Sequence, residues 1–444
     1  MQADWNTLTP EQKRAERLKG WLNPPESDFA SPEAAAGYKA RVTRLLKAID
    51  LEVPDRVPVT LPVGSFPLHY AGMTLKDGMY DNEAAVRAYR KFFEDFDIGD
   101  TASGAGMIMS GRASEILASV SQRWPGHGLP DDAPMNQFVE GEYMKADEYD
   151  HFLYDCADWC FRKYMPRSLG ALKVFETFSP LYDMLGMPNR FVMPAVRKDV
   201  RDAFQAIIDY GKEVEEWGKP AMALAREIYA AGYPAMMGGQ SHAPFDILAD
   251  TLRGTRGIIM DMYRQPDKVM KAIEMLIPMN IDIGVRMANQ SKRPFVFFAL
   301  HKGDDMFMSD EQFMKFYWPG LKAVVLGLIE EGIIPILFAE GRYNLRLPFI
   351  KDLPRGKVIW HFDQTDMFKA KDTLGDIACI QGNVPTSLLI TGTPQQVKDY
   401  CRQLIEYCGK GGGFILTGGA SINKGDPDNL RAMTDAVKEY GVYA

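Results

Sequence analysis

Five short apolar runs in the second half of the chain decide the fold: PFVFFAL at residues 294–300, IIPILFA at 333–339, KVIW at 357–360, IACI at 377–380 and GFIL at 413–416. Segments with helical spacing separate most of these runs. Strands that alternate with helices in one direction form a parallel sheet, which makes the fold class α/β. If that sheet closes into a (β/α)8 barrel, the C-terminal ends of all its strands open on one face, where such barrels keep their chemistry.

An acidic residue, Glu340, stands at the end of the second run and precedes a glycine. A carboxylate at the end of a buried strand must be paired or bound to a metal, because burying a bare charge is costly. Two interpretations follow. Glu340 either forms an ion pair with Arg342 or Arg346, or it serves as a metal ligand or general base.

The third run ends in His361, with Asp363 two positions later. Residues two apart in a strand face the same side, and neighbouring strands lie about 4.8 Å apart. Glu340 and His361 on adjacent strand ends could therefore share one metal, and zinc accepts such nitrogen and oxygen ligands in catalytic sites. The alternative for His361 is a core histidine whose hydrogen bonds are satisfied within the protein.

The loop after the first run reads HKGDD at residues 301–305. Its His301 and Asp304 could supply a third metal ligand or an acid and base for catalysis, and a solvated loop is the alternative. We assign Asp363 to the same catalytic group.

Methionines and aromatic residues recur near the predicted strand ends, and the chain has 25 Met residues. Met fills irregular gaps in cores, but together with Phe it could also form an adaptable wall for an aromatic ligand. His242 follows a predicted strand and either lines this pocket or caps the next helix. The residues assigned to substrate binding are Phe66, His69, Tyr70, Met107, Phe178, Met236, His242 and Phe298.

Composition excludes several classes of function. The net charge is −8 and no run of Lys or Arg is present, so nucleic acid is not expected as a partner. The five cysteines form no CxxC pair, which predicts reduced thiols in a cytoplasmic protein. Neither a signal peptide nor an apolar run long enough to span a membrane is expected. Nucleotide-binding motifs such as GxGxxG are missing.

The chain divides into an N-terminal helical arm at residues 1–50 and a barrel at residues 51–444. Helices are predicted at residues 9–22 and 31–49, followed later by a long one at 199–231. Further strands are predicted at 172–178 and 234–237. Residues 124–150 are rich in Pro and Gly and predict an insertion over the barrel mouth.

The C-terminal motifs resemble those of the uroporphyrinogen decarboxylase superfamily. They read IQGNVP at residues 380–385, LLITGTPQQV at 388–397, GGFILTGGA at 412–420 and DNL at 428–430, and DRVPV at 55–59 is similar to that family's entry to its first strand. The resemblance spans most of residues 40–440. It implies a (β/α)8 TIM barrel, here with a helical arm and an insertion over the barrel mouth.

The resemblance also indicates which of the superfamily's activities to expect. Decarboxylases of the superfamily carry an arginine-rich loop after the first strand, whereas residues 61–70 read LPVGSFPLHY, without arginine. The methylcobamide:coenzyme M branch binds zinc through a His-x-Cys pair and a distant Cys, and the matching positions here are Phe338, Glu340 and Ala420. The resemblance therefore implies an oxygen and nitrogen zinc site at Glu340 and His361, in place of a sulfur site.

Such a site is expected in corrinoid-dependent methyltransferases that demethylate methoxylated aromatics, the O-demethylase components. The resemblance thus implies zinc, a small methoxylated aromatic substrate, and cob(I)alamin carried by a separate corrinoid-binding protein. It also admits a homodimer. The alternative is a metal-free barrel of the same superfamily that acts as a decarboxylase or binds an aromatic or tetrapyrrole ligand.

Overall fold

A computed structural model describes residues 5–102 and 108–443 of the chain. Its central sheet has six parallel strands that lie side by side in chain order. They are β4 (Met237–Ser241), β5 (Phe295–Leu300), β6 (Ile334–Ala339), β7 (Ile359–Phe362), β8 (Cys379–Val384) and β9 (Phe414–Gly418). All five apolar runs of the sequence are therefore confirmed as strands, and the α/β class with a parallel sheet is confirmed with them.

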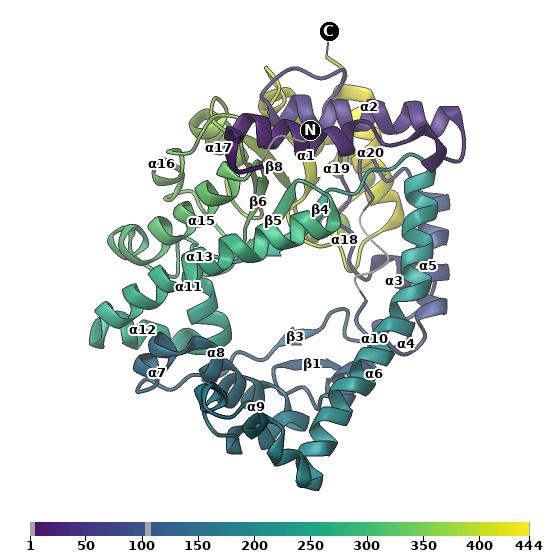
Figure 1. Cartoon of the computed structure of the whole chain (residues 1–444). Helices are drawn as coiled ribbons and strands as arrows, with labels where there is room; N and C mark the ends of the chain where they lie inside the picture. The colour runs from purple at the N-terminus through teal and green to yellow at the C-terminus, as the bar shows by residue number, and fades with distance from the viewer. Residues whose placement is uncertain (1–4, 103–107, 444) are drawn as a thin grey trace.

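Helices connect the strands along the whole sheet (Figure 1). Those between β4 and β9 are α11 (Pro244–Asp246), α12 (Gly254–Arg264), α13 (Pro266–Ser291), α14 (Asp310–Gln312), α15 (Trp318–Glu330), α16 (Leu347–Ile350), α17 (Met367–Leu374), α18 (Thr386–Thr391) and α19 (Pro394–Cys408). The last helix is α20 (Pro427–Tyr440). None of the described helices is both long and apolar enough to cross a membrane.

Ten α-helices precede β4 in the described residues, and three of them were predicted above. They are α1 (Pro10–Leu22), α2 (Pro32–Ile49), α3 (Phe66–Tyr70), α4 (Leu75–Tyr80), α5 (Asn82–Asp95), α6 (Gly111–Ile116), α7 (Tyr149–Tyr154), α8 (Cys156–Trp159), α9 (Met165–Ser168) and α10 (Lys198–Ala230). Thr9 and Ser31 cap the first two helices, which confirms both predicted helices of the arm. The long helix predicted near residue 200 is confirmed as α10.

The predicted first strand lies beside β9. Leu416 N donates to Pro58 O at 2.9 Å, and Thr60 N donates to Leu416 O at 3.0 Å. On its other side, Asp100 N donates to Val59 O at 2.8 Å. In the described residues the regular pairing of the central sheet covers β4–β9, and the first segment extends it through isolated bridges such as that of Val59 with Leu416. The hydroxyls of Thr60 and Thr417 add a side-chain hydrogen bond of 2.8 Å.

One face of the sheet, which we call the inner face, carries the arm. Paired residues Phe297, Ile336, Ile359 and Cys379 point to this face and form one buried cluster with α1 and α2. Trp21 of α1 packs edge-on against Phe295 with ring centroids 5.0 Å apart. Figure 1 shows both arm helices across one end of the sheet, while β1 (Gln122–Pro125) and β3 (Gln137–Phe138) lie toward the opposite end. The arm therefore covers the N-terminal end of the inner face.

A buried carboxylate ties the arm to the first strand. Asp100 is fully buried and accepts from Arg44 at 2.5 Å, from Arg56 at 2.9 Å and from Val59 N at 2.9 Å. Arg44 also pairs with Asp55 at 2.5 Å. The DRVPV segment thus carries an ion-pair network as well as a strand.

The strand predicted at residues 172–178 is wrong. Residues Gly170–Thr177 form a 3₁₀ helix, because Leu172 and Phe175 are spaced by three and face one side of such a helix. They pack with Val200 and Ala203 of α10 in a small separate core. The strand predicted at 234–237 is displaced, since β4 begins at Met237 and Pro234 instead accepts a hydrogen bond from Ala102 N.

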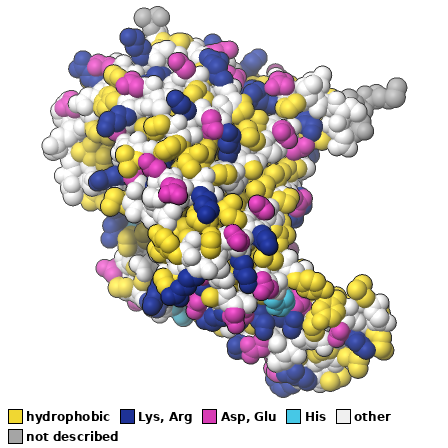
Figure 2. All heavy atoms as spheres, turned by 90° about the vertical axis from the view of Figure 1, so that its left-hand side faces the viewer, with side chains coloured by type: hydrophobic (Ala, Val, Ile, Leu, Met, Phe, Trp, Pro, Cys, Tyr) yellow, Lys and Arg dark blue, Asp and Glu magenta, His cyan; other side chains and the backbone are white. Residues whose placement is uncertain are grey.

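This separate core belongs to a projecting lobe around α8, α9 and the start of α10. Figure 2 shows the lobe at the lower right, with apolar side chains gathered on its surface. The strongly exposed ones include Leu185, Val192, Met193 and Val196. The insertion between the lobe and the sheet contains a small sheet in the order β2 (Gly128–Leu129), β1, β3.

Candidate active site

Strand register brings the predicted polar residues together at the C-terminal end of the inner face. Ala299, Phe338 and His361 are paired across β5, β6 and β7. Two positions beyond Ala299 and Phe338, His301 and Glu340 follow on the same face. Their side chains approach, with His301 Nε2 3.6 Å from Glu340 Oε1. The sequence prediction that strand ends converge is therefore confirmed for this pair.

His301 lies between two carboxylates. Its Nδ1 is 2.6 Å from Asp250 Oδ2, and its Nε2 faces Glu340. The hydrogen bond with Asp250, followed by that with Glu340, raises the pKa of His301 to about 10. An imidazolium at this place has one N–H held by Asp250 and the other directed toward the strand ends.

Two acidic residues that were not predicted from the sequence contact the loop at residues 301–305. Asp246 of α11 and Asp250 of the following π-helical turn (Ile247–Leu252) both contact residues 301 and 302. Lys302 bridges Asp250 Oδ1 and Glu140 Oε2, each at 3.2 Å. The sequence carried one signal for them: both follow His242 closely, at the C-terminal end of a strand.

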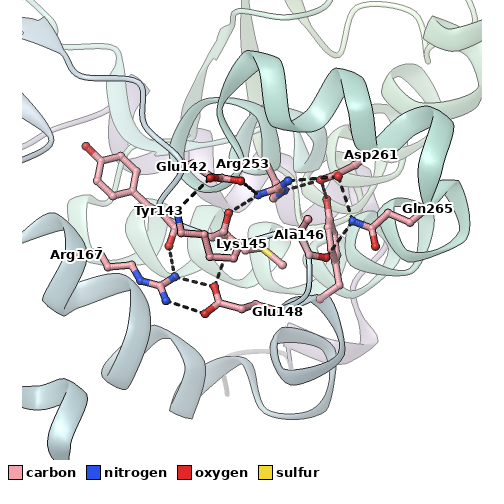
Figure 3. Close-up of polar contacts among 11 residues, drawn as sticks. Glu142, Tyr143, Lys145, Ala146, Glu148, Arg167, Arg253, Asp261 and Gln265 are labelled. Atoms are coloured by element: carbon pink, nitrogen blue, oxygen red, sulfur yellow. Dashed lines mark hydrogen bonds and ion pairs between the residues drawn. The ribbon is translucent and has the colours of Figure 1, made fainter.

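The insertion reaches the site through Glu140 and is fastened next to it. Figure 3 shows Arg253 between Glu142 of the insertion, at 2.8 Å, and Asp261 of α12. Gln265 Nε2 also donates to Ala146 O at 3.0 Å. These residues border a cavity of about 890 Å³ beside α12. The insertion is thus held to α12, the helix that follows Asp246 and Asp250, and in Figure 1 its strands β1 and β3 lie toward the end opposite the arm. Its position over a barrel mouth stays a prediction.

His361 is buried on the inner face. Its Nε2 lies 2.8 Å from Gly418 O, and its ring packs on Phe338 with centroids 4.6 Å apart. Burial lowers the pKa of His361 to about 4. Because a carbonyl oxygen can only accept, Nε2 carries the proton and Nδ1 keeps its lone pair.

Asp363 and Asp304 are the other predicted catalytic residues. Asp363 Oδ2 accepts from Gly341 N at 3.1 Å, and burial raises its pKa. Asp363 also borders a cavity of about 750 Å³ with Arg342. Asp304 Oδ1 accepts the N–H groups of residues 306 and 307, each at 2.9 Å, so it shapes a turn. Gly341, at φ +79°, lets Asp304 approach the end of β6, since a Cβ there would lie 2.7 Å from Asp304 Oδ2.

The residues predicted to bind substrate are scattered. His242 is at the site, where burial and then His301 lower its pKa. Met236 packs at the arm end of the inner face, and Phe298 is buried on the opposite face of the sheet. Phe178 belongs to the lobe core. Met107 lies outside the described residues.

Two of the three predicted substrate residues on α3, Phe66 and Tyr70, pack against α5 and its C-terminal end. Phe66 lies in an aromatic group with Phe92 and Phe96, and Tyr70 donates to Asp95 at 2.8 Å. His69 is half-buried, burial lowers its pKa, and its Nε2 has no hydrogen-bond partner among the described residues. Beyond Phe295 on the inner face, the rings of Phe297 and Phe338 are stacked with centroids 6.0 Å apart. Strand alternation counted back from His301 and Glu340 would have found both.

Metal ligands were predicted at Glu340 and His361. Residues 5–102 and 108–443 contain no group of three or more His, Cys, Asp or Glu side chains placed to hold a metal ion. Glu340 lies two positions beyond Phe338, and Phe338 is paired with His361 of the neighbouring strand. The two predicted ligands therefore lie on one face of adjacent strand ends.

Comparisons with known proteins show the family and the fold of the chain. The family model for uroporphyrinogen decarboxylase (URO-D) matches residues 177–440, more than half of the sequence. No curated protein matches this chain. A solved structure, a methyltransferase from Methanosarcina mazei, is similar with a TM-score of 0.56 and 15% identity over 90% of this chain and 98% of its own. That likeness shows the fold, the TIM-barrel type of URO-D proteins. The chain belongs to the uroporphyrinogen decarboxylase family.

Proposed function

We propose that this protein is a methyltransferase that takes a methyl group from a methoxylated aromatic and passes it to cob(I)alamin on a separate corrinoid protein. The observation that carries the proposal is the placement of His301 between Asp250 and Glu340, beside the inner-face rings Phe338 and His361. This arrangement combines a proton donor with an aromatic wall. Eight strands closing into a barrel around this face are part of the same proposal.

Decarboxylation of a porphyrinogen is supported less well. Its propionate groups would need cations, and residues 61–70 after the first strand contain no arginine. The similar solved structure carries the name of a methyltransferase, which agrees with the proposal.

Zinc is the metal that we propose for this site, with Glu340 and His361 as ligands. The fit rests on His361, since its Nε2 donates to Gly418 O and leaves Nδ1 with a lone pair on an uncharged ring. Nitrogen and oxygen donors suit zinc in catalytic sites. Among residues 5–102 and 108–443 no third His, Cys, Asp or Glu side chain completes a metal-binding group with them. Bound zinc would supply a Lewis acid for the substrate oxygen.

The chain's own residues would handle the leaving oxygen. When the methyl group departs from an aryl ether, the C–O bond breaks and its electrons stay on oxygen as a phenolate. His301 holds a proton at Nε2 on the side of Glu340, and Asp250 holds the other ring nitrogen. Transfer of the Nε2 proton yields the neutral phenol. Phe297 and Phe338 offer flat apolar surface to the ring.

His301→Ala is expected to lower the turnover number more than about tenfold, because general acid catalysis contributes about a hundredfold or more. The measurement is methylcobalamin formation, followed by visible absorbance, with a saturating methoxyarene and a reduced corrinoid protein. His127→Ala is the matched control, since His127 lies in the insertion and pairs with Glu115 of α6 at 2.9 Å. Wild-type turnover in His301→Ala would show that the loop at residues 301–305 has only a structural role.

The substrate class is tested with a panel of donors and one corrinoid acceptor. Guaiacol-like methoxyphenols are expected to donate methyl groups, whereas uroporphyrinogen is expected to remain unchanged. A hydroxyl beside the methoxy group offers zinc a second oxygen, so ortho-hydroxylated donors should react best. Turnover of only non-aromatic methyl donors would refute the aromatic pocket. Decarboxylation of uroporphyrinogen would overturn the proposed function.

A further inference from the structure

Two carboxylates of the segment after β4 converge on the turn after β5. Asp246 is almost completely buried, with 2% of its surface exposed. Its Oδ2 accepts from His301 N at 3.2 Å and from the hydroxyl of Tyr317 at 2.9 Å, and its Oδ1 accepts from Lys302 N at 3.1 Å. A single side chain thus satisfies two consecutive backbone N–H groups, which fixes the direction in which the chain leaves β5.

The second carboxylate, Asp250, lies one helical turn later and on the same side. Its two oxygens are used separately: Oδ2 contacts His301 Nδ1 at 2.6 Å, and Oδ1 contacts Lys302 Nζ at 3.2 Å. The turn that carries it, Ile247–Leu252, is π-helical. Such turns inside helices are frequent at functional sites.

Side chains of alternating charge therefore run from the insertion to the strand ends. Glu140 contacts Lys302, Lys302 contacts Asp250, Asp250 contacts His301, and His301 contacts Glu340. Each internal member of this series has a partner on both sides. Removal of an internal charge takes one of two counter-charges from each neighbour in a half-buried place, which is costly.

We infer that Asp246 and Asp250 are positioning residues that hold the imidazole of His301 with Nε2 toward Glu340. Asp246 fixes the backbone at residues 301 and 302, and Asp250 fixes the ring through Nδ1. Together the two contacts restrict rotation of the His301 ring about its side-chain bonds. The activity part of the test rests on the proposed function, whereas the position of the ring does not.

The test compares crystal structures and kinetics of Asp250→Asn and Asp246→Asn with those of the wild type. Asp158→Asn is the matched control, because Asp158 of α8 is equally buried and pairs with Arg162 and His151 in the lobe, away from His301. In Asp250→Asn we expect the ring of His301 to turn and its Nε2 to leave Glu340. We also expect kcat to fall about tenfold to a hundredfold, with KM changed less than about twofold. Asp250→Glu should recover part of kcat.

Asp158→Asn should lower the melting temperature and leave both the ring and kcat as in the wild type. If the ring of His301 keeps its wild-type orientation in Asp250→Asn, the inference is overturned, whatever the protein's substrate. Failure of Asp246→Asn to fold leaves the decision with Asp250→Asn. If wild-type protein transfers no methyl group from any methoxyarene, the proposed function fails, and the position of the ring in the crystals still decides this inference.

Discussion

Alanine at Glu340 or His361 is expected to lower bound zinc and to reduce methyl transfer at least about a hundredfold, because the Lewis acid is lost altogether. His361 is the sharper case. Its Nε2 is committed to Gly418 O at 2.8 Å, so Nδ1 is the nitrogen left for a metal. Its ring is uncharged, and no proton has to be displaced. Elemental analysis of the purified variants gives the metal content, and methylcobalamin formation gives the rate.

Two controls separate ligand loss from general damage. His127→Ala removes a half-exposed histidine of the insertion that stacks on Trp124. Glu227→Ala removes a carboxylate that pairs with Arg90 on the surface at 2.9 Å. Both should retain zinc and activity. Full zinc retention in Glu340→Ala and His361→Ala would remove both residues from the metal site.

Asp100→Ala is expected to lower the free energy of unfolding by about 3–5 kcal/mol, because it leaves buried cations without their counter-charge. The carboxylate is fully buried and satisfies Arg44, Arg56 and the backbone N–H of Val59. Its loss would remove one of the two ion pairs through which Arg44 of α2 is tied to the DRVPV segment. Urea unfolding, followed by circular dichroism, measures the change.

The comparison is Asp202→Ala. Asp202 also forms an ion pair, with Lys198 at 2.7 Å, but both side chains are exposed on α10. Exposed pairs of this kind contribute about 0–1 kcal/mol, so little change is expected. Equal destabilisation by the two variants would contradict the assignment of a special role to the buried carboxylate.

The strands could be predicted because their signal is local. Each apolar run is short, bounded by polar or Gly residues, and followed by a side chain that belongs at a strand end, as at Glu340. The same local reasoning failed at residues 172–178, where apolar content alone indicated a strand. The spacing of Leu172 and Phe175 is three, which fits a 3₁₀ helix.

The site could be predicted only in part. Glu340 and His301 meet because consecutive strands of a parallel sheet are neighbours, a relation visible in the sequence. Asp250 and Asp246 were missed because their contacts with His301 join positions more than fifty residues apart and depend on how a helix leaves β4. The choice of Phe298 over Phe297 shows a different limit. Both are apolar neighbours, and only strand alternation tells which one faces the site.

The position of the arm determines the order in which the protein can fold during its synthesis. Trp21 packs on Phe295, so its partner leaves the ribosome after more than 250 further residues have been added. At about 5–20 residues per second, the apolar sides of α1 and α2 stay exposed on the order of tens of seconds. Helices of this length are marginal in water without tertiary contacts. The arm is therefore made long before the strands on which it packs, and its apolar sides stay open to chaperones during that time.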